Sequence, residues 1–351
     1  MAALYGAGFP ELLDAAASPA ARPSAAQLPP TTAAAEHLPK LERLLMAAAR
    51  SGPRDLGPAA MELVRAGGKR VRPLLVLLAA RACAPGKRSR GRVALAMATE
   101  LVHSATLLHD DVIDDGLTRR GLPAPRVAFG NSVSVLAGDW LLTASLDLAL
   151  RSKVPGAVEA LVRTLRQLVE GEARQLSLRG STAFTAEDAL SVARLKTGSL
   201  FGFCGEAGAL AAQAPAAVVE ALRQFGLHCG TAFQIADDLL DFESDAATLG
   251  KAVLADVVEG KPSLPLAIAL KRLPPLREEM AALLRPLEEE ELRTRVKAFA
   301  VKLGRTGALG AARRIAEGER DRALDALAGV PEGPTRTLLS HVARVLLARS
   351  S

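Results

Sequence analysis

Apolar residues recur every three to four positions through most of the chain from about residue 38 onward, the spacing that buries one face of an α-helix. Short segments containing Gly or Pro separate the periodic stretches, and none of these stretches alternates with the two-residue period of a strand. The pattern predicts helices over roughly 38–50, 72–83, 91–115, 132–150, 156–177, 187–212, 215–243, 263–272, 275–285, 289–302, 306–327 and 334–349. We therefore expect an all-α fold.

Residues 38–349 contain no fixed-period repeat and no Gly- or Ser-rich linker, so we expect one helical domain, near the upper size limit for a single core. Residues 1–37 differ, because they are rich in Ala, Pro and Ser and are expected to form a poorly ordered extension. The extension includes Glu11 and Asp14 and lacks a basic segment followed by an apolar one, which argues against a signal or transit peptide.

Composition agrees with helices, because aromatic residues make up 3% of the chain and strands draw on aromatic and β-branched side chains. The formal net charge of +6 would suit nucleic acid or small polyanions. The basic residues are scattered and no aromatic-bearing basic motif accompanies them, so we expect no nucleic-acid partner and favour small polyanionic substrates.

The cysteines and the hydropathy pattern bear on where the protein works. Cys83, Cys204 and Cys229 are odd in number and share no disulfide or metal-site spacing, which favours a reducing compartment, and we expect the cytoplasm. The most apolar stretch, 133–150, is interrupted by Asp139 and Asp147, so we expect no transmembrane segment.

Acidic residues gather at the end of the predicted helix 91–115, in the sequence Asp110-Asp111-Val-Ile-Asp114-Asp115. Asp110 and Asp114 are one helical turn apart, where like charges cost about 0.2–0.5 kcal/mol per pair even when exposed. We expect a cation to compensate Asp110, Asp111 and Asp114, which we name the first aspartate array.

The helix 215–243 carries the same Asp-Asp-x-x-Asp spacing at Asp237, Asp238 and Asp241, with Gln234 on the same face. This is the second aspartate array, and we expect the two arrays to face each other. One acidic cluster could equally be a solvated helix end, but a second copy on another apolar helix with basic residues downstream favours a metal site. Oxygen ligands without His or Cys favour Mg²⁺ over zinc, and Mg²⁺ usually also binds substrate phosphates.

Motifs spread over residues 40–349 resemble the trans-polyprenyl diphosphate synthase family, above all its long-chain octaprenyl, heptaprenyl and solanesyl members. They are GGKRVRP at 67–73, the stretch 103–121, GEARQ at 171–175, KTG at 196–198, the stretch 233–241, LGK at 249–251 and EGKPSLP at 259–265. The resemblance implies a large helical bundle of the isoprenoid synthase type, with a central cavity between antiparallel helices. The chain departs from the family pattern at Leu254, where the family often has Gly, so the loop is expected to differ in shape.

The resemblance also implies the reaction, in which isopentenyl diphosphate condenses with an allylic diphosphate primer by ionisation, condensation and elimination, with release of diphosphate. Three Mg²⁺ ions would take part. Asp110, Asp114, Asp237 and Asp241 would hold the metal, with support from the neighbouring Asp111 and Asp238.

Basic and polar residues in the motifs acquire roles through the same resemblance. The implied pocket for isopentenyl diphosphate consists of Lys69, Arg72, His103 and Arg120. The implied contacts to the allylic diphosphate are Arg119, Lys196, Lys251 and Lys261, with Thr197 and Gln234 beside the reacting carbons. Lys and Arg suit these roles because they donate charge-assisted hydrogen bonds to phosphate oxygens, although each residue alone could equally be a solvated or core side chain.

Two small residues, Ala105 and Thr106, precede the first aspartate array. Thr106 lies one turn before Asp110 on the same face, whereas Ala105 points off that face and its relevance rests on the resemblance, since short-chain members commonly have a bulky aromatic residue at one of these positions. Because a growing tail needs an open cavity, small residues predict a long product of about eight isoprene units (about C40), suited to a quinone side chain. Alternatively, the small residues merely permit helix packing.

Other functions remain open. A geranylgeranyl or farnesyl diphosphate synthase would share every motif, and a terpene cyclase would share the metal chemistry but guide cyclic cations with aromatic faces, which are scarce here. A non-catalytic regulatory subunit of a heteromeric synthase is disfavoured by the two intact arrays, although an active chain could still need a partner. The resemblance implies a homodimer, and the apolar product suggests weak membrane association during release.

Overall fold

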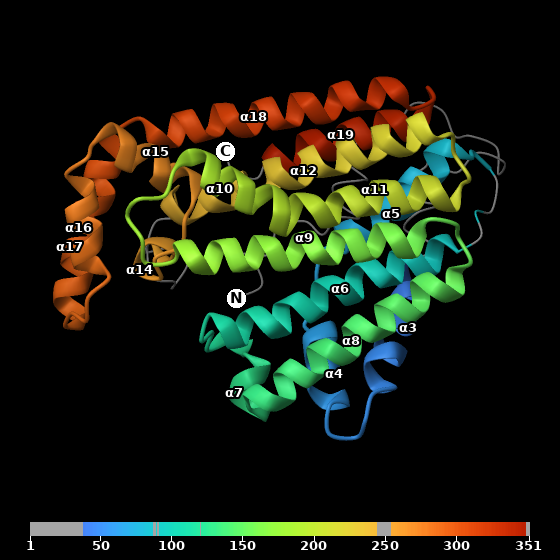
Figure 1. The fold of residues 1–351 in the computed structure, drawn as a ribbon, viewed down its shortest axis with the longest axis horizontal. Helices are drawn as coiled ribbons and strands as arrows, with labels where there is room; N and C mark the ends of the chain where they lie inside the picture. Colours follow the sequence, from blue (N-terminus) through green and yellow to red (C-terminus); the bar gives the residue numbers. More distant parts are fainter. Residues whose placement is uncertain (1–37, 87–88, 90, 120, 244–253, 349–351) are drawn as a thin grey trace, which may run out of the picture. The chain divides into compact units, whose positions relative to one another are not determined.

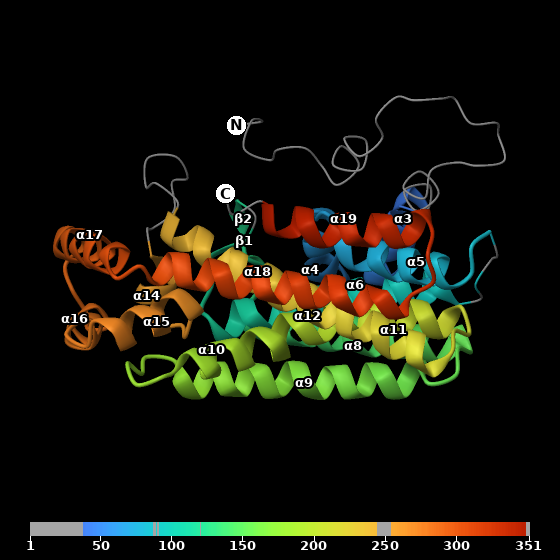
Figure 2. The same cartoon turned by 90° about the horizontal axis from the view of Figure 1, so that it is seen from above.

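The computed structural model describes residues 38–86, 89, 91–119, 121–243 and 254–348 (Figures 1 and 2). The predicted extension 1–37 lies outside these residues. Contacts along the chain separate two compact units: unit 1 comprises Met1–Leu161, Cys204–Glu220 and Val330–Leu339, and unit 2 comprises Val162–Phe203, Ala221–Gly329 and Ser340–Ser351. Helices α9, α11, α12 and α19 contribute residues to both units. One domain over 38–349 stays a prediction.

Unit 1 is built around α6, which packs along α8 and against α5. Its elements are α3 (Leu38–Arg50), α4 (Gly57–Arg65), α5 (Val71–Cys83), α6 (Arg92–Ile113), β1 (Thr118–Arg119), β2 (Leu122–Pro123), α7 (Pro125–Phe129) and α8 (Asn131–Ser152), with the first residues of α9. Helix α5 is buried at every position from Pro73 to Ala80, because it carries an unbroken apolar run. It is therefore a core helix.

Unit 2 holds its own apolar core, formed by α15 against α18 together with α16 and α17. Figure 2 shows α16 and α17 together at the end of α15. Its elements are α9 (Ala157–Leu178), α10 (Ala186–Ala193), the π-helix η1 (Arg194–Gly198), α11 (Ser199–Ala211), α12 (Ala216–Glu243), α14 (Ala255–Val258), α15 (Leu264–Arg272), α16 (Leu276–Leu283), α17 (Glu289–Arg305), α18 (Ala308–Ala326), the 3₁₀-helix η2 (Leu327–Gly329) and α19 (Pro334–Ala348), with the first residues of α9 and parts of α11, α12 and α19 counted in unit 1.

The structure confirms the all-α class and most of the predicted helices to within a few residues. The helix predicted over 187–212 is interrupted by the π-helix Arg194–Gly198. A single π-turn adds one residue to a helix, and the spacing of apolar residues did not reveal it here. The short helices α4 and α7 were not predicted. Both begin with Pro at the first or second position, which favours helix starts but is ambiguous in sequence.

A small antiparallel hairpin is the second difference, since Thr118 pairs with Pro123 and Arg119 with Leu122. We expected no strands, and strands of two residues are too short to show any alternation. Gly121, with a φ of +78°, provides a backbone conformation that residues with a Cβ atom rarely adopt.

Helix α8 has the length and composition to cross a membrane, and 33% of its most apolar window is buried. Core helices pass the same test, so α8 does not contradict the expected lack of a transmembrane segment. Within unit 1 it packs on α6, α4 and α7.

Helix α10 begins with a capping box that also connects it to α9. The backbone N–H of Asp188 donates to Thr185 Oγ1 at 3.2 Å, and the backbone N–H of Thr185 donates to Asp188 Oδ2 at 2.9 Å. Arg174 Nη2 on α9 donates to Asp188 Oδ1 at 2.9 Å. The Arg174 hydrogen bond, followed by those from Thr185, lowers the pKa of Asp188 to about 2.

We predict that Asp188→Asn lowers the free energy of unfolding near neutral pH by about 1 kcal/mol, as expected for a lost helix cap. A lowered carboxyl pKa stabilises the fold above the ordinary Asp pKa of about 4, and this stabilisation is lost as the pH falls toward 2. Urea unfolding from pH 7 downward should therefore show the gap between wild type and variant narrowing below about pH 4. Asp325→Asn, at an exposed site on α18, is the matched control. A gap that stays constant with pH would contradict the assignment.

Candidate active site

The first aspartate array lies where α6 ends in unit 1. Asp110 and Asp111 belong to its last turn, and Asp114 is the first residue beyond it, with its N–H still bonded to the Asp110 carbonyl at 2.8 Å. Asp115 follows with a φ of +53°, which turns the chain toward the hairpin. Asp110 and Asp114 therefore keep the one-turn relation that their spacing predicts.

Asp111 differs from its neighbours because its side chain is 1% exposed. Its Oδ1 accepts hydrogen bonds from Arg119 Nε at 2.9 Å and Arg119 Nη2 at 2.5 Å, while its Oδ2 accepts none within the described residues. The hairpin β1–β2 carries Arg119 back to this carboxylate. Asp111 thus anchors one of the predicted diphosphate contacts. Arg120 lies outside the described residues.

Lys69 and Arg72, two of the predicted isopentenyl diphosphate residues, flank in sequence a buried arginine that the sequence did not single out. Arg70 lies between Lys69 and Arg72, and its guanidinium contacts Glu42 of α3 at 2.6 Å and Glu100 of α6 at 2.5 Å. Burial opposes the charge of Arg70, but the two carboxylates raise its pKa above the ordinary value. These contacts fix the turn from which Lys69 and Arg72 extend, because a buried charge must keep its partners.

His103 and the two small residues all lie on α6. Ala105 is 1% exposed, whereas Thr106 is half-buried and donates its hydroxyl to the His103 carbonyl at 2.9 Å. The hydroxyl proton of Thr106 is therefore used within its own helix.

The second aspartate array lies near the end of α12 in unit 2, and a further carboxylate joins it. The backbone N–H of Asp256, on α14, donates to Asp241 Oδ2 at 3.2 Å. Burial, then the charge of Asp241, raises the pKa of Asp256 to about 7. Burial, then the charge of Asp256, raises the pKa of Asp238 well above its usual range. The ionised forms of these crowded, buried carboxyl groups are thus disfavoured by the protein alone, and a divalent cation would stabilise them.

The donor set of the two arrays fits magnesium, since all the donors are carboxylate oxygens. Within the described ranges, no three His, Cys, Asp or Glu side chains converge into a ready-made cage. A magnesium site that also binds substrate phosphates needs one or two protein carboxylates, with phosphate and water oxygens as further ligands.

The π-helix η1 presents Lys196 and Thr197 to two different helices of unit 2. Thr197 Oγ1 donates to Gln234 Oε1 at 2.6 Å, and Gln234 Nε2 donates to Asp238 Oδ1 at 2.8 Å. The structure thereby brings together three residues that the sequence placed in one site. Lys196 is held from α9, where its Nζ pairs with Glu172 and lies 3.3 Å from Gln175 Oε1. Glu172 and Gln175 had no predicted role, although both belong to the motif at 171–175.

Two predicted lysines follow α12 in the sequence, and the structure describes one of them, Lys261. Lys251 lies outside the described residues. Lys261 pairs with Glu259 at 2.6 Å, and its backbone N–H donates to the Asp256 carbonyl at 2.8 Å. Lys261 is therefore attached to the same segment as the second aspartate array.

Glycines allow the π-helix to lie unusually close to α12 and α9. A Cβ atom on Gly198 would stand 2.7 Å from Thr231 Oγ1 and 3.0 Å from the Leu227 carbonyl oxygen. A Cβ atom on Gly171 would stand 2.7 Å from the Cβ of Leu195. Substitution at either glycine must therefore move the segment that carries Lys196 and Thr197.

We predict that Gly198→Ala lowers stability by about 1–3 kcal/mol, as overpacking typically does, and also lowers kcat. The matched control is Gly304→Ala on α17, where an added Cβ meets nothing within 4 Å and helix propensity predicts a gain of about 0.5–1 kcal/mol. Thermal unfolding and steady-state kinetics measure both effects. Equal unfolding temperatures for the two variants would contradict the close approach.

Comparisons with known proteins agree with this architecture. The Polyprenyl synthetase family model matches residues 54–301. The chain is 35% identical over 288 residues to the octaprenyl diphosphate synthase of Escherichia coli (strain K12), covering 82% of this chain and 88% of that protein. It is 35% identical over 309 residues to heptaprenyl diphosphate synthase component 2 of Geobacillus stearothermophilus, covering 88% of this chain and 94% of that protein.

A solved structure extends the similarity to the fold. The polyprenyl synthase from Caulobacter crescentus CB15, complexed with calcium and isoprenyl diphosphate, matches with a TM-score of 0.84 and 34% identity. The match covers 92% of this chain and 97% of that chain. The all-helical fold and the paired Asp-Asp-x-x-Asp motifs identify the fold as that of the isoprenoid synthases. The chain belongs to the polyprenyl synthetase family and is a prenyltransferase. The family predicted from the motifs is therefore confirmed.

Proposed function

We propose that the chain is a magnesium-dependent long-chain trans-polyprenyl diphosphate synthase that makes an all-trans product of about eight isoprene units (about C40), because small side chains leave room for a long tail. Its substrates are isopentenyl diphosphate and an allylic diphosphate primer, and its product suits a quinone side chain. The observation that carries the chain-length proposal is the pair of small residues, Ala105 and Thr106, five and four residues before Asp110 on α6. The names of the octaprenyl and heptaprenyl relatives support the same product class.

We propose that Asp110, Asp114, Asp237 and Asp241 hold three Mg²⁺ ions. Bound magnesium would neutralise charge on the allylic diphosphate as it departs. The crowding of carboxyl groups around Asp241 supports a cation at the second aspartate array: burial, then the neighbouring carboxylates, raise the pKa values of Asp238 and Asp256, and a bound cation would relieve that repulsion. Asp111 and Asp238 act by holding Arg119 and Gln234, respectively.

The basic residues bind the two diphosphates. Lys69, Arg72, His103 and Arg120 form the isopentenyl diphosphate pocket in this proposal, and the ion pairs of the buried Arg70 support it by holding the turn beside Lys69 and Arg72. Arg119, Lys196, Lys251 and Lys261 donate charge-assisted hydrogen bonds to the allylic diphosphate. Such donors stabilise the charge that develops on a leaving group most strongly when their positions are preorganised.

No nucleophilic side chain is required, because the allylic carbon ionises and the double bond of isopentenyl diphosphate attacks the cation. Thr197 and Gln234 lie beside the reacting carbons in this proposal. Their hydrogen bond at 2.6 Å holds the Thr197 hydroxyl and the Gln234 amide oxygen in place. The hydrogen bond from Gln234 Nε2 to Asp238 Oδ1 fixes the orientation of the amide. The proton lost on elimination leaves with the released diphosphate.

We propose that the chain acts as a homodimer in the cytoplasm. Helix α9 exposes a heptad-spaced apolar stripe in unit 2, consisting of Val162, Val169 and Leu176, which suits a second copy of the chain. The cysteines support a reducing compartment, since Cys83, Cys204 and Cys229 are all free thiols. The apolar product would allow weak membrane association during release.

The purified chain alone, with Mg²⁺, isopentenyl diphosphate and an allylic primer, should release diphosphate and form a prenyl product, and EDTA should abolish both. Chromatography of the dephosphorylated product should show about C40 as the main species, because Ala105 and Thr106 are small and would leave room for a long tail. Exclusive C15 or C20 product would instead make the chain a farnesyl or geranylgeranyl diphosphate synthase. A folded chain that is inactive until a second protein is added would favour the regulatory-subunit alternative.

We further predict that Ala105→Phe shortens the product by several isoprene units, because a ring replaces a methyl group at a buried position on α6. Ala105→Ser, which keeps the side chain small, should leave product length unchanged. Product chromatography at matched turnover measures both variants. A folded, active Ala105→Phe enzyme with the wild-type product would remove Ala105 from the account of chain length.

A further inference from the structure

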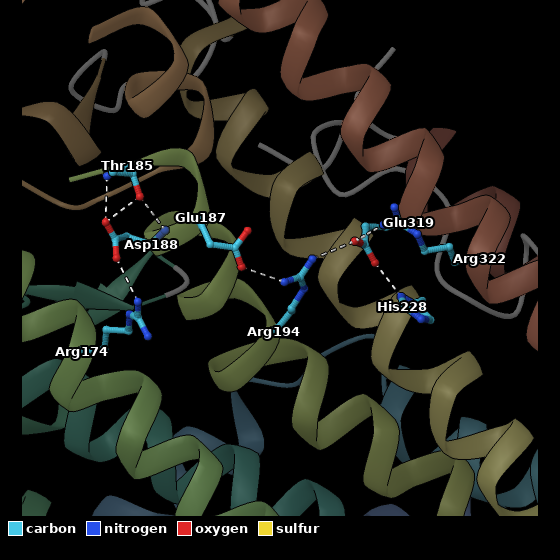
Figure 3. Close-up of polar contacts among 8 residues, drawn as sticks. All are labelled: Arg174, Thr185, Glu187, Asp188, Arg194, His228, Glu319 and Arg322. Carbon is cyan, nitrogen blue, oxygen red and sulfur yellow. Dashed lines mark hydrogen bonds and ion pairs between the residues drawn. The ribbon is translucent and has the colours of Figure 1, made fainter. Parts of the chain in front are cut away.

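A buried carboxylate on α18, Glu319, lies far along the chain from every motif of the family and has three basic partners (Figure 3). His228 Nδ1 lies 2.6 Å from its Oε2, and Arg322 Nη1 and Arg194 Nη2 lie 2.7 and 3.5 Å from its Oε1. The Glu319 side chain is 1% exposed. All four residues belong to unit 2.

The partners keep Glu319 ionised. Burial would raise its pKa, but the hydrogen bond from His228 and the charges of His228, Arg322 and Arg194 lower it below the ordinary value. Because a carboxylate can only accept, His228 Nδ1 must be the donor. A buried charge that loses a partner destabilises the fold, so the side chains around Glu319 are held in one arrangement.

Two of the partners lie on the elements that carry proposed site residues. Arg194 is the first residue of the π-helix η1, two residues before Lys196. His228 lies on α12, six residues before Gln234, which accepts the Thr197 hydroxyl. The carboxylate of Glu319, on α18, therefore contacts both the start of η1 and the middle of α12.

A π-helix depends on stabilising tertiary contacts of this kind more than an α-helix does. A π-turn widens the helix and is uncommon, so it persists where surrounding contacts favour it. Arg194 is the first residue of η1, and its guanidinium is held on two sides, by Glu319 at 3.5 Å and by Glu187 of α10 at 3.1 Å. The two carboxylates differ, because Glu187 is 72% exposed and exposed ion pairs contribute little.

We propose that Glu319 is a positioning residue for prenyl transfer, which holds η1 through Arg194 and α12 through His228 so that Lys196 and Thr197 meet the allylic diphosphate. This rests on the proposed roles of Lys196 and Thr197. Without the contacts of Glu319, the start of η1 shifts while the aspartate arrays keep their own contacts. Binding of the allylic substrate and the chemical step should suffer, whereas binding of isopentenyl diphosphate should not.

The test is Glu319→Gln, which keeps the shape of the side chain and removes its charge. Steady-state kinetics on the purified full-length enzyme should show kcat/KM for the allylic diphosphate reduced about ten- to hundredfold, the usual effect of a small misplacement of reacting groups. KM for isopentenyl diphosphate should change less than about twofold, since its pocket is untouched.

Matched controls separate positioning from folding. Arg322→Gln removes a Glu319 partner that does not reach η1, and Glu187→Gln removes the exposed partner of Arg194, so both should stay within about twofold of wild type. Arg194→Gln should reproduce the Glu319→Gln defect, and the double variant should be no worse than either single variant, because the two residues act together. Wild-type constants for Glu319→Gln or Arg194→Gln would overturn the proposal, as would a loss of activity that only follows the folded fraction. If Glu319→Gln fails to fold, Arg194→Gln alone decides.

A parallel variant, Lys196→Gln, distinguishes this proposal from the proposed function. If Lys196→Gln keeps the wild-type KM for the allylic substrate, the role of Lys196 fails, and the positioning proposal fails with it. If Lys196→Gln raises that KM while Glu319→Gln does not, Lys196 keeps its role and only the positioning by Glu319 is contradicted.

Discussion

The main constraint on the site is repulsion between carboxylates, which the fold holds close together at the ends of apolar helices. In unit 1 the chain balances part of this charge itself, since Arg119 pairs with the buried Asp111 and Arg126 pairs with Asp115 at 2.8 Å. In unit 2 the balance is incomplete, because burial and neighbouring charge raise the pKa values of Asp238 and Asp256. Such an arrangement is costly for folding and useful for binding a cation together with an anionic substrate.

A second constraint is the placement of the short π-helix that carries Lys196 and Thr197. Glycines permit its close approach, since an added Cβ at Gly198 or Gly171 would overlap its neighbours. Polar contacts then hold it on three sides: Glu172 on α9, Gln234 on α12 and, through Arg194, Glu319 on α18. The segment is thus positioned by packing and by charge at once, which is how a preorganised site avoids reorganising during reaction.

Much of this architecture could be predicted from the sequence, because helix period and motif spacing are local properties. The long helices and the Asp-Asp-x-x-Asp arrays followed from such patterns, and the family followed from the motifs. The π-helix could not be predicted, since α11, which follows it, is buried at most positions and has no single apolar face whose shift would reveal an inserted residue. Arg70, Asp256 and Glu319 were also missed, because each owes its importance to partners that are distant in sequence. Only the pairing of a buried arginine with Glu42 and the buried Glu100 could have pointed to Arg70, and burial is a property of the folded chain.

The central claim is that the arrays bind magnesium and diphosphate together. Isothermal titration calorimetry of inorganic diphosphate into the purified protein tests it directly, with and without Mg²⁺, for the wild type and for Asp110→Asn and Asp237→Asn. The account predicts that diphosphate binds tightly only when Mg²⁺ is present, and that each variant weakens this binding at least about tenfold, as removal of a charged ligand should. Equal affinity for diphosphate in EDTA and in Mg²⁺ would contradict it.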